Sequence, residues 1–154
     1  MNKVLYHSVR VHCHTDYAFA MFTENAHLQK WLTERADVEP RIGGKYELFW
    51  NPDDRENNST IGCRITAIVP PKFLAFEWKG PPQYKDFMNT ADPLTHVVVF
   101  FIPCVEKKRT DACTEIHLIH SGWRIPQEWE EARIWFGRAW NEAFKNLERY
   151  VNKE

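Results

Sequence analysis

The sequence lacks the motifs by which the commonest enzymes and nucleotide-binding proteins are recognised. Its 154 residues contain no G-x-S-x-G, P-loop or G-x-G-x-x-G pattern and no C-x-x-C pair, which argues against the usual hydrolase, nucleotide, zinc-knuckle and dithiol sites. It also lacks an excess of charge of either sign, because 20 lysines and arginines are scattered among 21 acids for a net charge of -1. Without a basic field to attract phosphates, we expect no nucleic-acid partner.

The sequence has no apolar run long enough to cross a bilayer. The longest, THVVVFFIPCV at residues 95–105, is far shorter than the roughly 20 residues that a spanning helix needs. The first residues do not show the charged and then apolar pattern of a signal peptide. We therefore expect a cytoplasmic protein without a membrane span.

Cysteine is scarce and dispersed. The four cysteines, Cys13, Cys63, Cys104 and Cys113, are widely spaced, so their positions form no pattern typical of a metal or redox site. We expect them to be reduced, mostly buried thiols and not disulfides.

Aromatic residues, in contrast, are abundant. They make up 14% of the chain, with 7 tryptophans and 10 phenylalanines, and such rings both fill cores and line pockets for apolar ligands. A chain of this length with 44% hydrophobic residues can bury one substantial core. We expect a single domain spanning residues 1–154.

The first half of the chain begins with strand periodicity and then turns helical. Residues 4–14 alternate between apolar and polar side chains, and two short helices are expected over residues 16–22 and 25–32. From Lys45 the period becomes two again, with Tyr46, Leu48 and Trp50 on one face and Lys45, Glu47 and Phe49 on the other.

Gly43 and Gly44 open this strand. We interpret them as serving backbone geometry, through a positive φ or a close approach of another backbone, and not as ligand contacts.

Four further strands are expected, at residues 61–69, 72–80, 95–105 and 113–123. Residues 80–94 contain three prolines and no period, which predicts a long loop whose apolar side chains fold over something apolar. Ile116, Leu118 and His120 share one face of the last strand. A bulge between Ile65 and Ile68 would reverse which face the residues beyond it occupy.

From Pro126 to about Val151 the pattern is that of one long helix. Its apolar residues form a wide stripe that should cover a sheet, with Trp135 at the edge of the stripe where it could face solvent. The stripe comprises Trp129, Ala132, Phe136, Ala139, Trp140, Ala143, Phe144, Leu147 and Val151.

Several segments resemble one known family over nearly the whole chain. They are KWLTERADVEPRIGGKYELF, GCRITAIVPPKFLAFEW, THVVVFF and TEIHLIHSGW, and the family is the domain shared with the activator of heat-shock protein 90 ATPase, within the START-like (SRPBCC) superfamily. The resemblance implies an α+β helix-grip fold, in which a curved antiparallel sheet wraps around a long C-terminal helix and two short helices follow the first strand.

The resemblance is specific for fold and not for function, because such domains include ligand carriers, cyclases and co-chaperone modules. This sequence departs from the family in Pro126, in its richer tryptophan content near the last helix, and in the length of the 80–94 loop. Loops at the open end of the grip control access, so ligand choice would be altered there.

The expected binding site is a cavity between the sheet and the long helix. Six residues are predicted to line it, namely Trp50, Phe76, Trp78, His120, Phe136 and Trp140. His120 is the most informative of them, because a buried imidazole needs a hydrogen-bond partner. It is either a satisfied core histidine or a group that orients a ligand or exchanges a proton.

Other titratable pairs give weaker hypotheses. His12 and His14 lie two residues apart on one strand face, but no third metal ligand can be named, so we expect no metal and no cofactor. His117 shares a face with Cys113 and Glu115, where a nucleophile would lack an enclosing pocket.

Three functions remain open. The first is binding of a small hydrophobic or aromatic molecule, oriented by His120. The second is a co-chaperone or protein-interaction module, with a chaperone or another protein as partner, and a homodimer remains possible because of Trp135 and the sheet edges. The third is catalysis by His120, which we rank last because the sequence shows no second acid or base that converges on it.

Overall fold

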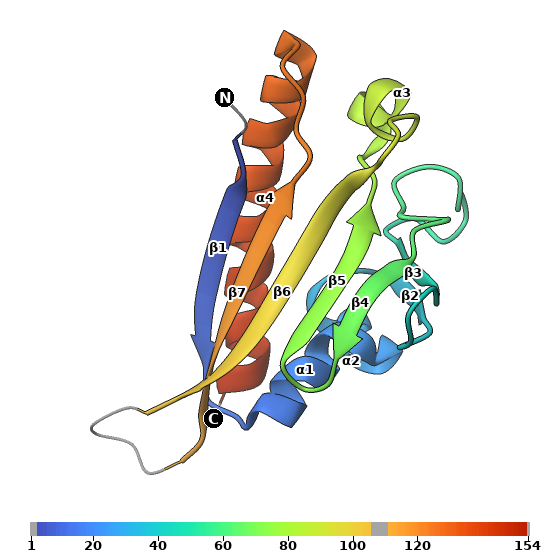
Figure 1. Ribbon diagram of the computed structural model, residues 1–154. Coiled ribbons are helices and arrows are strands. Elements are labelled where there is room, and N and C mark those ends of the chain that lie inside the picture. The colour runs from blue at the N-terminus through green and yellow to red at the C-terminus, as the bar shows by residue number, and fades with distance from the viewer. Residues whose placement is uncertain (1–2, 106–110, 154) are drawn as a thin grey trace.

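The computed structural model describes residues 3–105 and 111–153. Its elements are strands β1 (Leu5–Val11), β2 (Arg35–Val38), β3 (Tyr46–Phe49), β4 (Ile65–Val69), β5 (Phe73–Trp78), β6 (Thr95–Cys104) and β7 (Cys113–Ser121), helices α1 (Thr15–Thr23), α2 (Asn25–Trp31), α3 (Lys85–Met88) and α4 (Gln127–Asn152), and a short 3₁₀ turn, η1 (Pro82–Tyr84) (Figure 1).

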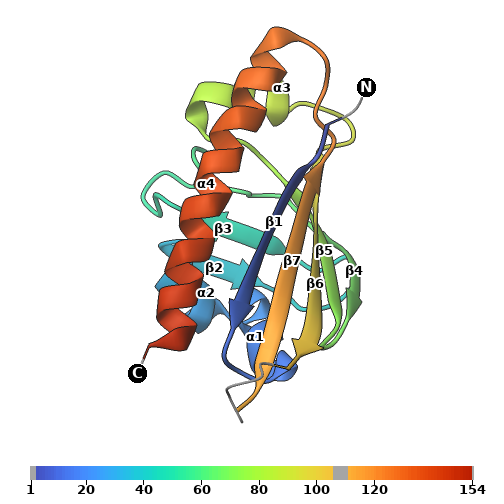
Figure 2. The ribbon, with the colours of Figure 1, turned by 90° about the vertical axis from the view of Figure 1, so that its left-hand side faces the viewer.

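Five antiparallel strands form the main sheet in the order β1-β7-β6-β5-β4, and α4 runs along one face of it (Figure 2). Helices α1 and α2 lie near the C-terminal end of α4, whereas α3 lies near its beginning (Figure 2). This arrangement is the α+β helix-grip fold that the sequence predicts. In the described residues no helix is both long and apolar enough to cross a membrane.

The sheet differs from the expected arrangement of about six strands. Strands β2 and β3 pair in a separate two-stranded sheet, and β2 was not predicted because RADV is short and only Val38 is buried. The predicted alternation of β3 agrees with the structure, with Tyr46 and Leu48 buried on one face, but the opposite face is partly covered as well. Phe49 is buried, since residues 51–60 fold back on it and the Arg55 guanidinium lies 4.4 Å from its ring centroid.

The apolar stripe of α4 packs as predicted. Trp129, Ala132, Phe136, Trp140, Phe144 and Leu147 are buried. The matching face of β7 contributes Ile116, Leu118 and His120, all of them fully buried. The register of β4 with β5 shifts between Ile65 and Ala67, within the stretch where a bulge would reverse the faces of the residues beyond it.

The segment 80–94 is more ordered than predicted. It contains η1 and α3 instead of an unstructured loop, and its apolar side chains do fold onto α4. The Tyr84 ring lies 5.9 Å from Trp135, and Phe87 lies 5.0 Å from Trp129. Met88 is fully buried. Sequence patterns do not reveal η1 and α3, because these helices contain only three and four residues.

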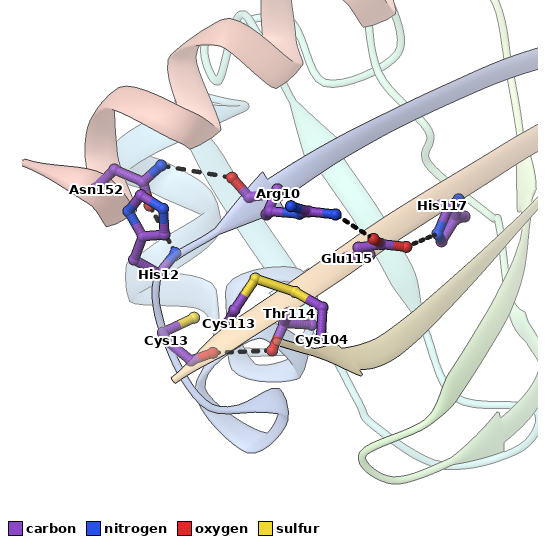
Figure 3. The surroundings of a disulfide bond; sticks show 9 residues. All are labelled: Arg10, His12, Cys13, Cys104, Cys113, Thr114, Glu115, His117 and Asn152. Atoms are coloured by element: carbon purple, nitrogen blue, oxygen red, sulfur yellow. Dashed lines mark hydrogen bonds and ion pairs between the residues drawn. A yellow bond between two sulfur atoms is a disulfide. The ribbon is translucent and has the colours of Figure 1, made fainter. Parts of the chain in front are cut away.

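The prediction of four reduced cysteines is wrong for two of them. Cys104 and Cys113 form a disulfide (Figure 3), while Cys13 and Cys63 are free. The register of β6 and β7 places the two cysteines directly opposite each other, which the sequence does not reveal. The charged segment EKKRTD at residues 106–111, which the sequence predicts to be a turn between these strands, lies almost entirely outside the described residues. Disulfides are rare in the cytosol, so this bond argues against the expected cytoplasmic location.

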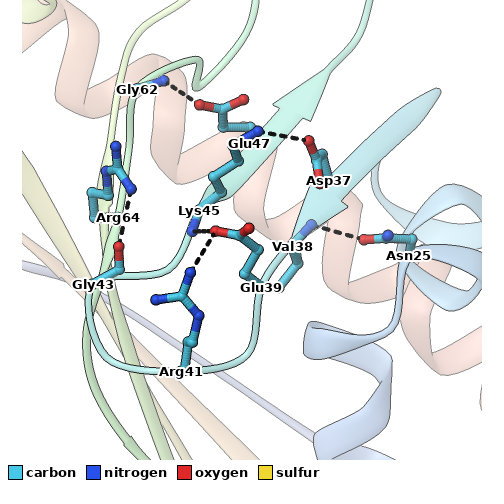
Figure 4. Close-up of polar contacts among 10 residues, drawn as sticks. All are labelled: Asn25, Asp37, Val38, Glu39, Arg41, Gly43, Lys45, Glu47, Gly62 and Arg64. Atoms are coloured by element: carbon cyan, nitrogen blue, oxygen red, sulfur yellow. Dashed lines mark hydrogen bonds and ion pairs between the residues drawn. The ribbon is translucent and has the colours of Figure 1, made fainter.

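Gly43 and Gly44 serve geometry, as predicted. Gly43 has a φ of +79°, and a Cβ on Gly44 would lie 2.2 Å from the Glu39 carbonyl oxygen. The tight turn is closed by the Glu39 carboxylate, which accepts from the Lys45 backbone N–H, and by Arg64, which donates to the Gly43 carbonyl (Figure 4). The turn joins β2 to β3.

We predict that Gly44→Ala destabilises the fold by about 2 kcal/mol or more, because backbone must move to admit the methyl group. Gly137→Ala, in the middle of α4, is the matched control. Its Cβ would meet only Leu5 Cδ2 at 3.6 Å, so we expect a gain of roughly 0.5–1 kcal/mol from helix propensity. Urea unfolding of both variants measures the difference, and equal stabilities would contradict the assigned close approach.

Candidate functional site

A cleft of about 460 Å³ lies beside α4, where the ends of α2, β3 and β5 and the segment after β5 approach it. Six of its lining residues are aromatic, and polar side chains lie among the others. The lining residues are Trp31, Leu32, Trp50, Asn58, Ser59, Trp78, Lys79, Gly80, Pro81, Pro82, Gln83, Trp135, Phe136, Ala139, Trp140, Glu142, Ala143 and Asn146.

The structure brings together four of the six residues predicted for the site. Trp50, Trp78, Phe136 and Trp140 line the cleft, but Phe76 and His120 do not. Phe76 is buried and stacks on Tyr46 at a centroid distance of 3.8 Å. The alternation of side chains along the strands identified the correct face of the sheet for both residues. It does not show whether a residue on that face reaches the cleft.

Sequence reasoning missed Trp31 and Trp135 as lining residues. Trp31 is buried at the end of α2, and its indole N–H donates to the Met21 carbonyl at 2.9 Å. Trp135 is half-buried between Tyr84 and Phe136, with centroid distances of 5.9 and 4.9 Å. Its place at the edge of the helical stripe was the available signal, because a side chain there borders the opening.

The cleft walls are held by contacts between rings. The Trp78 centroid lies 6.0 Å from that of Trp50 and 5.1 Å from that of Trp140. The Trp50 indole N–H donates to the Leu32 carbonyl at 2.9 Å, which ties it to the end of α2. The aromatic surface is therefore fixed by packing from three separate elements.

His120 stands behind this surface and is fully buried. The Trp140 indole N–H donates to His120 Nδ1 at 3.0 Å, and His120 Nε2 lies 3.0 Å from Thr95 Oγ1. Because an indole can only donate, Nδ1 must accept, which assigns the imidazole proton to Nε2 and directs it to Thr95. The Thr95 hydroxyl in turn donates to the Trp78 carbonyl at 3.3 Å.

Both nitrogens of His120 are thus engaged by protein groups. This agrees with the satisfied core histidine among the two alternatives and leaves neither nitrogen for a ligand. Its role is to position two residues of the cleft, since it bonds directly to Trp140 and, through Thr95, to the backbone of Trp78.

Burial also removes His120 from acid–base chemistry near neutral pH. Its pKa is lowered to about 3, mainly by the loss of solvation on burial and to a smaller extent by the like charges that His96 and His7 can carry. The ring therefore stays neutral in the folded protein, with its one lone pair held by Trp140. A proton-exchange role would require this hydrogen bond to break.

The opening of the cleft is polar and carries one charge of each sign. The Lys79 ammonium donates to the Ile61 carbonyl at 2.6 Å, and Glu142 is exposed on α4. Asn58, Gln83 and Asn146 complete the border. Such a border can fix the orientation of a bound molecule, but it provides no net charge to select an ion.

The other titratable candidates lie elsewhere. On the outer face of β7 the His117 ring bonds to Glu115 at 3.1 Å and to the Tyr6 hydroxyl at 2.6 Å. Cys113 is oxidised and therefore offers no thiolate to His117. In residues 3–105 and 111–153, no three His, Cys, Asp or Glu side chains gather as metal ligands, at His12 and His14 or anywhere else.

The sheet, the covering helix and the cleft beside it define a protein of the helix-grip, START-like class. The chain belongs to the family described as activator of Hsp90 ATPase homolog 1-like protein, whose sequence pattern matches residues 13–152. A search of curated proteins finds no match.

Three solved structures similar to this chain share its fold across nearly their whole length. Protein MLL2253 from Mesorhizobium loti has a TM-score of 0.73 at 17% identity, covering 96% of this chain and 95% of its own. PFC0360w from Plasmodium falciparum, titled an HSP90 activator, has a TM-score of 0.69 at 20% identity, with coverages of 96% and 95%. The Aha1 dimer from Colwellia psychrerythraea has a TM-score of 0.68 at 14% identity, with coverages of 98% and 97%.

The buried neutral state of His120 predicts a pH-dependent stability. In the unfolded chain its pKa returns to the ordinary value of 6.5, so below that pH the unfolded state binds a proton that the folded state does not. Stability must therefore fall as the pH falls from 6.5 toward 3. Between about pH 7 and about pH 5 we expect this group alone to cost about 2 kcal/mol.

Urea unfolding of the wild type and of His120→Gln at both pH values measures this cost. The variant should be less stable at the higher pH, but it should lose about 2 kcal/mol less than the wild type on acidification. His14→Gln, at an exposed position, serves as the control and should keep the full pH dependence. If His120→Gln keeps it as well, His120 is not the group that resists protonation.

Proposed function

We propose that the protein binds a small apolar or aromatic molecule in the cleft beside α4. The observation that carries this proposal is the convergence of Trp50, Trp78, Trp135, Phe136 and Trp140 on one opening of about 460 Å³. Ligand sites in proteins are typically clefts of about 300–1,000 Å³ lined mainly by aromatic and apolar side chains with a few polar groups.

The shape of the helix surface supports the same proposal. Within the cleft, α4 presents the small side chains of Ala139 and Ala143 between larger rings. These alanines leave space that a longer side chain would fill, so a gap remains beside the aromatic rings, which also contact one another. A flat ligand in this gap would contact indole faces and edges on several sides, which favours aromatic molecules.

Filling the gap from the protein side tests this proposal. We predict that Ala139→Trp lowers the affinity for the neutral fluorescent probe phenylnaphthylamine at least about tenfold, because the new ring occupies the site. Ile134→Trp, which adds an indole at an exposed position of α4 outside the cleft, should leave the affinity unchanged. Fluorescence titration, with circular dichroism to confirm folding, distinguishes the two. Unchanged binding by folded Ala139→Trp would refute the cleft as the site.

A second candidate is a co-chaperone or protein-interaction module. Its specific support is that PFC0360w, which matches this chain over almost its whole length, is titled an HSP90 activator, and that the family bears the same description. A homodimer belongs with this candidate, because the Colwellia structure is titled a dimer.

The second candidate predicts that saturating amounts of the protein raise the ATP turnover of the chaperone Hsp90 severalfold. Ala139→Trp should then stimulate as well as the wild type, since a protein interface does not need an open cleft. The absence of any stimulation would exclude this activity, and light scattering across a range of concentrations would decide the oligomeric state separately.

A further inference from the structure

The indole N–H of Trp78 is a buried donor in the lining of the cleft. Trp78 is only 3% exposed. Within residues 3–105 and 111–153, its backbone carbonyl accepts from Thr95, but its Nε1 donates to no protein acceptor. Buried donors are nearly always paired, because an unpaired one loses its hydration without compensation. A lone donor in a binding cleft therefore indicates an acceptor supplied from outside the chain.

The other tryptophans show how unusual this donor is. The indoles of Trp31, Trp50, Trp123 and Trp140 all donate, to Met21 O, Leu32 O, His120 O and His120 Nδ1 respectively. In the described part of the chain Trp129 and Trp135 likewise donate to no protein group, but Trp129 is outside the cleft lining and Trp135 is only half-buried. Trp78 alone combines deep burial, a place in the lining and an unused donor.

The four rings in contact with Trp78 cannot accept its indole N–H. Its ring contacts are Trp50, Phe76, Trp140 and His120, at centroid distances of 5.1–6.5 Å. Three of these rings have no acceptor nitrogen, and the one lone pair of His120 already receives the Trp140 N–H. Because Trp78 belongs to the lining of the cleft, a molecule bound there can supply the acceptor.

The charges around the cleft indicate what kind of acceptor it is. Lys79 and Glu142 are the charged residues in the lining, and their charges cancel. Glu142 is exposed and Lys79 already donates to Ile61. A carboxylate or an ammonium on the ligand would therefore lose hydration on entering the aromatic interior without gaining a dedicated counter-charge. A neutral oxygen pairs with an indole N–H at much smaller cost.

Building on the proposed binding function, we infer that the ligand is a neutral aromatic molecule bearing an acceptor oxygen, such as an aryl ketone, and that Trp78 Nε1–H donates to this oxygen. The rings of the cleft bind the aromatic body. Trp78 is then the residue that distinguishes an oxygenated ligand from a hydrocarbon of the same shape.

A matched pair of probes tests this inference, namely methyl naphthyl ketone and isopropenylnaphthalene, which differ in replacing the carbonyl oxygen by a methylene group. We expect the wild type to bind the ketone about fivefold more tightly, the value of one ordinary hydrogen bond. Trp78→Phe, which keeps a ring but removes the donor, should abolish this preference. Trp50→Phe is the matched control, because its indole already donates to Leu32, and it should keep the preference.

A second measurement avoids any change in the core. In nitrogen–proton correlation spectra of the wild type, the indole resonance of Trp78 should move downfield with the ketone and not with the hydrocarbon. Binding of both probes with equal affinity and no such shift would overturn the inference while leaving the proposed binding function intact. If neither probe binds, the proposed function and the inference fail together.

Discussion

The hydrogen bond from the Trp140 indole to His120 is the interaction on which the site depends. It joins the middle of α4 to the inner face of β7, and the opposite nitrogen of the same imidazole continues through Thr95 on β6 to the backbone of β5. Four elements are thus connected through one buried ring. Because buried polar groups must be satisfied together, this chain fixes the rotation of α4 and, with it, which side chains of the helix border the cleft.

The positions of the aromatic walls follow from this fixed helix. Trp140 cannot turn away from the sheet without leaving His120 unpaired, so its ring stays beside Trp78. Phe136, one turn earlier on α4, contacts His120 edge-on at 5.3 Å. Ala139 and Ala143 then necessarily face the ends of β3 and β5, and their small size leaves the gap that forms the cleft.

The sequence predicts this architecture well because its signals are local. The periods of two and of 3.6 identify β1, β5, β6, β7 and α4, the paired glycines identify the turn before β3, and the inward face of β7 follows from alternation alone. What it could not predict depends on register between distant strands. The Cys104–Cys113 disulfide exists because β6 and β7 pair in one particular register, and β2 is a strand because β3 lies beside it.

The candidate site shows the same limit in another form. Alternation places Phe76, Trp78 and His120 toward the helix, and all three are buried there, but whether an inward residue reaches a cavity or packs behind one depends on the length of its neighbours. Phe76 is covered by Tyr46, and His120 by Trp140, whereas Trp78 lines the cleft together with Ala139 and Ala143 of α4. Whether an inward residue lines the cleft or packs in the core therefore depends on the small residues of α4. A search for large aromatic residues does not consider these positions. A cleft can be anticipated where small helical residues face a cluster of rings, and here that cluster contains the donor of Trp78.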